Sequence, residues 1–278
     1  MNLRKISKVF NVVFLSTIFF LVSCSSNDEL NLNSNEELTV QEVENIIMAD
    51  DVSSEIEEVL EDDSLDYGLV TRGSNGSSIA DCVTRTVETT STSVIVTLYF
   101  GDGCETKRGK ILAGKVIIEY VKTNEGFSKT VSFEGFSVNE NQVTGGLSII
   151  RVKENSNGNP QSTITVDVKV TLTTGVEITR KGERVREMIE GAETKDRGDD
   201  VFSITGNWES VNRNGVVRKA VVTTNLIRKF ACKFIVSGVV EITKKDRVYT
   251  LNFGDGECDN KAILTDANGN TKEITLRR

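Results

Sequence analysis

The chain has no histidine among its 278 residues. Histidine is the commonest general base near neutral pH and a frequent zinc ligand, so its absence excludes Ser-His-Asp catalysis, Cys-His catalysis and His-ligated zinc. Trp208 is the only tryptophan, which excludes a row of aromatic platforms for polysaccharide. No spacing singles out two carboxylates as the acid and base of a glycoside hydrolase. The sequence therefore predicts a protein that is not an enzyme and has no cofactor, and a glycoside hydrolase is the least favoured alternative.

Basic residues are missing from one long stretch of the chain. From Cys24 to Thr71 there are 15 acidic residues and no lysine or arginine, whereas from Arg72 onward 30 basic residues face 26 acidic ones. An acidic leader thus precedes a nearly balanced body. The basic residues of the body are interspersed with acids, so there is no basic patch of the kind that binds nucleic acid. No nucleic-acid partner is predicted.

The apolar run near the N-terminus is too short for a membrane span. Val9 to Val22 covers about 14 residues, and a span needs roughly 20. Three basic residues precede this run, and the sequence LVSC ends it at Cys24. This combination resembles the lipobox of bacterial lipoproteins, which implies a signal peptide over residues 1–23 and a lipid on Cys24. Several acyl chains on Cys24 would form a stable membrane anchor.

The composition divides the rest of the chain into four segments. Residues 24–38 are polar and predict a flexible tether, and residues 67–79 predict a Gly/Ser-rich linker. Between them, residues 39–66 predict an acidic helical leader that opens with a capping box, TVQE. Its apolar residues recur at helical spacing and allow either two short helices or one bent helix. The apolar stripe either docks on the body or belongs to a spacer helix that only touches it.

Residues 80–278 alternate between apolar and polar side chains. In TITVDVKVTL, for example, five apolar residues from Ile164 to Leu172 alternate with polar ones, and turn residues separate this run from similar ones. This alternation predicts a mainly β fold: an antiparallel meander of roughly a dozen strands with a short N-terminal helical leader. Counting strands leaves an open curled sheet, a sandwich and a barrel as alternatives.

Four cysteines remain after Cys24, and an even number in an exported chain indicates two disulfides. The sequence FGDG occurs twice, each time at the predicted end of a strand: Cys104 follows the first directly, and Cys258 follows the second after one residue, Glu257. In an antiparallel hairpin, facing residue numbers have a constant sum, which is 183 for the first hairpin and 491 for the second. The sums for Cys82 with Cys104 and for Cys232 with Cys258 are 186 and 490. The cysteines of each pair therefore lie nearly opposite each other, and the spacing predicts these two bridges.

The repeated order of cysteine, hairpin, FGDG and cysteine indicates an internal repeat, with lobes at 80–190 and 200–278. We interpret FGDG as a structural corner in which glycine adopts positive φ and aspartate caps the turn. A cation site is the alternative, and no metal is predicted. Its weak candidate ligands are Asp102 with Glu105, and Asp255 and Asp259 with Glu257. Asn268-Gly269 predicts a type I′ hairpin turn rather than part of a calcium loop.

The N-terminal features together are similar to those of outer-membrane lipoproteins of the Bacteroidetes: LVSC followed by SSNDE, a polar tether and a short acidic leader before an all-β body. The two FGDG-Cys hairpins resemble repeats in lipoproteins of that group. The resemblance implies an outer-membrane location. Asp28 and Glu29 resemble a surface-export signal but lie two residues later than usual, so the cell surface and the periplasmic face both stay open. Asp63-Ser64-Leu65 resembles an acceptor for O-glycosylation at Ser64.

These observations favour a membrane-anchored binding or structural module. Its partners would be the membrane, through Cys24, and a protein, glycan or lipid ligand. The alternative is a carrier for a lipid or another apolar ligand, because a one-sided meander can curl into a cradle.

Overall fold

The computed structural model describes residues 38–66, 82–106 and 109–276, all of which belong to one compact unit, Ser34–Arg278. The predicted signal peptide, Cys24 and the Gly/Ser linker lie outside the described residues, so the expectations about them stay predictions. Within the described part of the chain, no helix is both long and apolar enough to cross a membrane.

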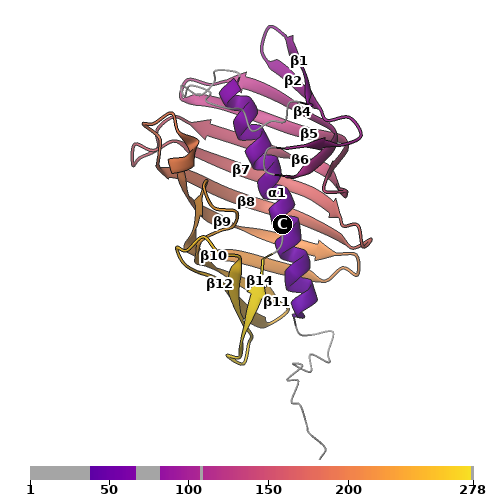
Figure 1. Cartoon of the computed structure of the whole chain (residues 1–278), viewed down its shortest axis with the longest axis vertical. Helices are drawn as coiled ribbons and strands as arrows, with labels where there is room; N and C mark the ends of the chain where they lie inside the picture. Colours follow the sequence, from indigo (N-terminus) through magenta and orange to yellow (C-terminus); the bar gives the residue numbers. More distant parts are fainter. Residues whose placement is uncertain (1–37, 67–81, 107–108, 277–278) are drawn as a thin grey trace, which may run out of the picture. The chain divides into compact units, whose positions relative to one another are not determined.

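The described strands form one antiparallel sheet of fourteen strands (Figure 1). Strand order follows chain order, except that the short β3 pairs beside β4. The sheet is open, with β1 and β14 as its edges, which decides for the open sheet over the sandwich and the barrel. The strands are β1 (Thr84–Thr89), β2 (Val94–Tyr99), β3 (Cys104–Glu105), β4 (Ile111–Lys122), β5 (Gly126–Val138), β6 (Asn141–Val152), β7 (Gln161–Thr171), β8 (Glu177–Glu190), β9 (Val201–Asn212), β10 (Val217–Lys229), β11 (Ser237–Lys244), β12 (Arg247–Asp255), β13 (Lys261–Thr265) and β14 (Thr271–Thr275), with a 3-10 helix, η1 (Arg197–Asp199), before β9.

Alternating side chains give the sheet one apolar face, as predicted. Every second residue from Ile164 to Leu172 is at most 4% exposed, whereas Thr165 and Asp167 between them face solvent. The same alternation buries Val116, Ile118 and Tyr120 in β4. Burial of these side chains on one face provides the main driving force for the fold.

The one α-helix among the described residues, α1 (Val40–Asp66), lies across the apolar face of the sheet (Figure 1). The predicted helical leader is therefore confirmed, and its apolar stripe docks on the body. The first half of α1 packs Val43, Ile46 and Ile47 into a core cluster with the strands from β8 to β14. The second half packs Val52 and Ile56 into another cluster with the strands from β2 to β8. The helix thus contributes to both clusters.

The sheet curls around the second half of α1. Residues 55–60 are all buried, and because 3.6 residues complete a helical turn, this stretch is covered on every side. Three strands reach it with a basic side chain: β5 with Lys129, β8 with Arg184 and β10 with Arg228. A flat sheet would reach only one side of a helix, so contacts from strands this far apart reflect the curl.

The two predicted lobes belong to one continuous sheet. Strands β8 and β9 pair along their length, from Ile178 opposite Asn212 to Glu190 opposite Val201, so the sheet has no gap between residues 190 and 200. The division appears instead in the apolar core, which forms the two clusters joined by α1. That the two lobes are repeats of each other stays a prediction.

The last hairpin, between β13 and β14, corrects one turn prediction. The hairpin is present, but the Asp266 backbone N–H donates to the Asn270 carbonyl oxygen across a three-residue loop, at 2.9 Å. Gly269 has a φ of 87°, whereas Asn268 is not in the left-handed region. This is a type I turn followed by a left-handed glycine, and the predicted type I′ turn was wrong.

Candidate functional site

Buried basic side chains line the face of the sheet that α1 covers. Six of them contact α1, and all six are 2–8% exposed. A buried charge is costly unless it is paired, so the fold must supply partners, and α1 supplies them. We call this set the basic cradle: Lys129 in β5, Arg180 and Arg184 in β8, Arg218 and Arg228 in β10, and Lys244 in β11.

Strand alternation places these cations on the buried face of the sheet, which α1 covers. Arg180 and Arg184 are separated by even numbers of residues from Ile178 and Met188, which are both buried in the core. Residues at such spacing point to the same face of a strand. Lys181 lies between the two arginines and is exposed on the opposite face. The sequence of β8 therefore directs two guanidinium groups into the interior.

The N-terminus of α1 is held by Glu42. Its Oε2 accepts from the Thr39 backbone N–H at 2.9 Å, while Thr39 Oγ1 accepts from the Glu42 N–H at 3.1 Å, which is the predicted capping box. The carboxylate also pairs with Arg218, and with Lys244 Nζ at 2.9 Å. Burial pushes the pKa of Glu42 up, but hydrogen bonds from Thr39 and Lys244 and the charge of Arg218 outweigh burial, so this pKa lies below its ordinary value.

The centre of the cradle is built around Trp208 in β9. The guanidinium carbon of Arg180 lies 4.4 Å from the centre of the indole ring, and that of Arg184 lies 5.3 Å from it. Arg180 also pairs with Asp50 of α1. Burial, and then the charge of Arg184, lower the pKa of Arg180 well below its ordinary value. The Asp50 carboxylate and the indole face are the groups at this position that interact favourably with the charged guanidinium.

The second half of α1 carries three further contacts. Arg184 Nη1 pairs with Glu57 Oε1 at 3.3 Å, and Arg228 Nη2 pairs with Glu58 Oε1 at 2.9 Å. Lys129 Nζ donates to the Leu60 backbone carbonyl oxygen at 2.7 Å. Charged contacts therefore extend along the helix from residue 42 to residue 60. The arrangement can bind an amphipathic acidic helix through apolar and ionic contacts at once.

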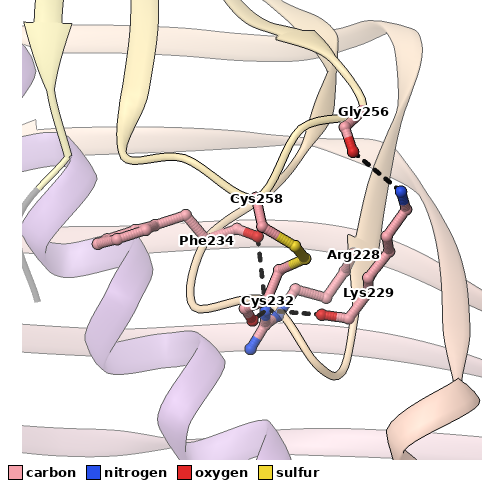
Figure 2. The surroundings of a disulfide bond; sticks show 6 residues. All are labelled: Arg228, Lys229, Cys232, Phe234, Gly256 and Cys258. Atoms are coloured by element: carbon pink, nitrogen blue, oxygen red, sulfur yellow. Dashed lines mark hydrogen bonds between the residues drawn. A yellow bond between two sulfur atoms is a disulfide. The ribbon is translucent and has the colours of Figure 1, made fainter.

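Both predicted disulfides are present, Cys82–Cys104 and Cys232–Cys258. Figure 2 shows the second bridge with Arg228 beside it. The Arg228 guanidinium donates to the backbone carbonyl oxygens of Cys232 and Lys229, the latter at 3.0 Å. Lys229 Nζ in turn donates to the Gly256 carbonyl oxygen at 2.9 Å, which joins the two sides of the loop. One member of the cradle is thus fixed by the disulfide-closed corner.

Only the first FGDG segment forms the predicted corner, in the turn that follows β2. The second lies largely within β12, which runs to Asp255 and has a β-bulge there. Gly101 has a φ of 62° and Gly254 a φ of 92°, both in the left-handed region. In the second segment, Asn252 Oδ1 accepts from the Gly254 N–H at 2.9 Å, so the cap comes from Asn252 and not from the predicted Asp255.

The acidic side chains near these segments were the candidate metal ligands. Asp102, Asp255 and Asp259 are all exposed, and Asp259 Oδ1 accepts from the Lys261 backbone N–H at 3.0 Å. Among the described residues, no group of three or more acidic, cysteine or histidine side chains is placed to hold a metal ion. Ser64, the candidate glycosylation site, lies in the last turns of α1.

Two cavities adjoin the cradle. A cavity of about 80 Å³ lies between α1 and the strands from β8 to β12 and is lined mainly by apolar side chains, including Ile46, Ile204 and Leu251. Trp208 lines it as well, and its Nε1 has no hydrogen-bond partner among the described residues. This volume suits a few water molecules, whereas ligand pockets usually hold about 300 Å³ or more.

The second cavity, of about 240 Å³, lies where residues 109–110 approach the loop at 230–233. Its lining is polar and basic, with Lys110, Asn139, Arg228 and Lys233 among its residues. Neither cavity offers an apolar space of lipid size while α1 is docked.

The basic cradle is the part of the site that sequence reasoning missed. Two signals pointed to it: the acidic leader without a single basic residue, and the arginines at inward-facing positions of a strand such as β8. Together these two signals indicate ion pairs between the leader and the sheet, because charges at inward positions need partners of opposite sign.

Comparison of the chain with models of known protein families, with curated proteins and with solved structures found no match.

Proposed function

We propose that this protein is a non-enzymatic lipoprotein, anchored to the outer membrane through Cys24, whose curled sheet acts as a binding module at the cell surface or the periplasmic face. The anchor and the location rest on the LVSC sequence and the polar tether that follows it. The binding role rests on the basic cradle.

The observation that carries the binding role is the mixed chemistry of the cradle. Apolar strand residues contact the apolar side of α1, and six buried cations contact its acidic residues or its backbone. An ordinary helix–sheet interface is apolar, because burying ion pairs gains little stability over apolar contacts. Buried charges at defined positions instead specify which segment binds and in which register. The sheet thus has the properties of a receptor for an acidic amphipathic segment, and α1 is its resident occupant.

The shifted pKa values favour a binding role over a catalytic one. The pKa values of Glu42, Glu187 and Asp266 all lie below their ordinary values. A carboxyl group that acts as a general acid near neutral pH needs a raised pKa. Glu42, Glu57 and Glu58 are moreover each paired with a cation of the cradle.

A carrier of apolar ligands is the second candidate. The apolar cavity beside Trp208 favours it, because the unpartnered Nε1 can donate a hydrogen bond to a small bound molecule. A lipid would have to displace α1. Native mass spectrometry of the full-length protein in mild detergent distinguishes the two candidates: a tightly bound lipid at one per chain supports the carrier, and its absence supports the helix receptor.

The experiment that tests the anchor compares the wild-type protein with Cys24→Ser in cells supplied with a labelled fatty acid. We expect the label and sedimentation with the outer membrane for the wild type, and neither for Cys24→Ser. Equal labelling of both proteins would overturn the anchor. Proteinase added to intact cells then separates the two faces, because a surface protein is digested and a periplasmic one is protected.

A further inference from the structure

We propose that the basic cradle also binds α1 of a second copy of this chain, so that two copies pair by exchanging their helices. This inference rests on the proposed function, because it requires the cradle to be a receptor for an acidic amphipathic helix. It adds the identity of a partner.

The charge pattern makes a second copy a matched partner. The acids of α1 that contact the cradle are spread over two-thirds of the helix, at Glu42, Asp50, Glu57 and Glu58. A ligand with one anionic group could satisfy one of these positions, and it would supply no carboxylate to the other arginines and lysines of the cradle. Every copy of the chain carries a helix with all four acids in register. The pattern thus favours a helix over a lipid, and this helix over an unrelated one.

The covalent structure leaves α1 separable from the sheet. Cys82–Cys104 and Cys232–Cys258 each join two segments of the body, and neither bridge is attached to α1. Between the end of α1 at Asp66 and the start of β1 at Thr84, the chain has 17 residues. A chain of that length spans at most about 60 Å, so the helix of one copy can reach the cradle of a neighbour.

The interface between α1 and the sheet is the same within one copy and in a swapped pair, so its cavity of about 80 Å³ favours neither state. In a reciprocal exchange both cradles are filled, so the ionic and apolar contacts of the separate copies are all retained. Such a swapped dimer has two-fold symmetry.

The proposed membrane anchor would favour exchange further. Chains held on one surface by a lipid have a higher effective concentration than free chains. A larger fraction of the chains therefore forms dimers, even when the affinity between two copies is weak. Exchange is therefore expected to increase with the surface density of the protein.

The Glu57–Arg184 pair supplies the test. In Glu57→Arg, the helix brings an arginine to Arg184, and in Arg184→Glu, the cradle brings a glutamate to Glu57, so neither variant can dock its own helix well. When both full-length variants are made in one cell, the helix of Glu57→Arg fits the cradle of Arg184→Glu, because the two altered side chains have opposite charges. The helix of Arg184→Glu likewise fits the cradle of Glu57→Arg, where the natural pair of Glu57 and Arg184 is restored. Two affinity tags, one on each variant, then isolate the mixed pairs.

We expect at least about tenfold more mixed pairs from this combination than from cells that make Glu57→Arg with both tags. The double variant Glu57→Arg/Arg184→Glu restores the pair within one chain and serves as the folded control. Wild-type copies with the two tags report the level of pairing in the natural protein. If the combination yields no excess of mixed pairs although the double variant is folded with α1 protected from hydrogen exchange, the exchange is overturned and the receptor role survives. If α1 is unprotected in the wild-type protein, both fail.

Discussion

Arg228 of β10 and Glu58 of α1 meet across 170 positions of the chain, with Nη2 donating to Oε1 at 2.9 Å. The same guanidinium group donates to backbone carbonyl oxygens in the loop closed by the Cys232–Cys258 bridge. Arg228 therefore contacts both α1 and the loop that the Cys232–Cys258 disulfide closes. Because Arg228 links α1 to this loop, single substitutions can test helix docking and stability.

Replacement of Arg228 by methionine should lower the free energy of unfolding by about 3–5 kcal/mol, because it breaks the buried ion pair between Arg228 and Glu58. Urea unfolding measures this change. Lys181→Met is the matched control, since Lys181 pairs with Asp167 on the outer face, where both side chains are more than 60% exposed. We expect a loss below about 1 kcal/mol there. Equal losses in the two variants would contradict a structural role for the buried pair.

Loss of the second disulfide should loosen α1 as well as the corner. Cys258→Ser removes the bridge that closes a 26-residue separation, at a cost of about 2–4 kcal/mol. Because the freed loop no longer positions Arg228, amide hydrogen exchange around Glu58 should become faster. Cys82→Ser is the control: it opens the first bridge and leaves Arg228 in place. Similar exchange around Glu58 in both variants would show that Arg228 does not carry the coupling.

Helix docking should weaken in acid through Glu42. Its pKa is lower in the folded protein than its ordinary value of 4.5, so its contribution to stability is complete above pH 4.5 and is lost as the pH falls through the lower folded value. Glu42→Gln preserves the capping box but removes the charge. The difference in unfolding free energy between the wild type and Glu42→Gln should be constant above pH 4.5 and shrink below it. A difference that grows in acid would contradict the assigned direction.

Gly182→Ala should disrupt the sheet beside Trp208. A methyl group at this position would lie 2.3 Å from the Asn207 carbonyl oxygen and 2.5 Å from Trp208 Cα, so β8 and β9 must separate. We expect a loss of at least about 3 kcal/mol, the upper end of the usual cost of overpacking. The emission of the only tryptophan should also shift to the red. In the control, Gly103→Ala, the nearest atom lies 3.6 Å away, and we expect little change in stability or emission.

Much of the fold was predictable because local rules determine it. Residue-number sums of 183 and 491 are the ones observed, with Thr84 opposite Tyr99 in the first hairpin and Ile242 opposite Tyr249 in the second. Once the register is known, the pairing of the cysteines follows. Alternation likewise identified the buried face, since side chains in a strand alternate strictly.

Two features were harder to predict. One is that the sheet stays open, and the other is that buried basic residues form the cradle. Whether a meander closes depends on twist, bulges and what covers its apolar face, and these are properties of the whole sheet. The cradle combines strands far apart in the chain, such as β5 with Lys129 and β11 with Lys244. Alternation shows that each cation faces inward but does not identify the acid that it meets. The turn at Asn268 shows a smaller limit, because one glycine suits two turn types.

The strand order has a consequence for the time course of folding. Apart from the short β3, each strand of the meander pairs with the next one along the chain, so the hairpins can form one after another as the chain is delivered from its N-terminus. Among the described elements α1 is delivered first, yet Lys244, a partner of Glu42, follows 202 residues later. Of the elements that the structure describes, the first to appear is therefore the last to complete its contacts.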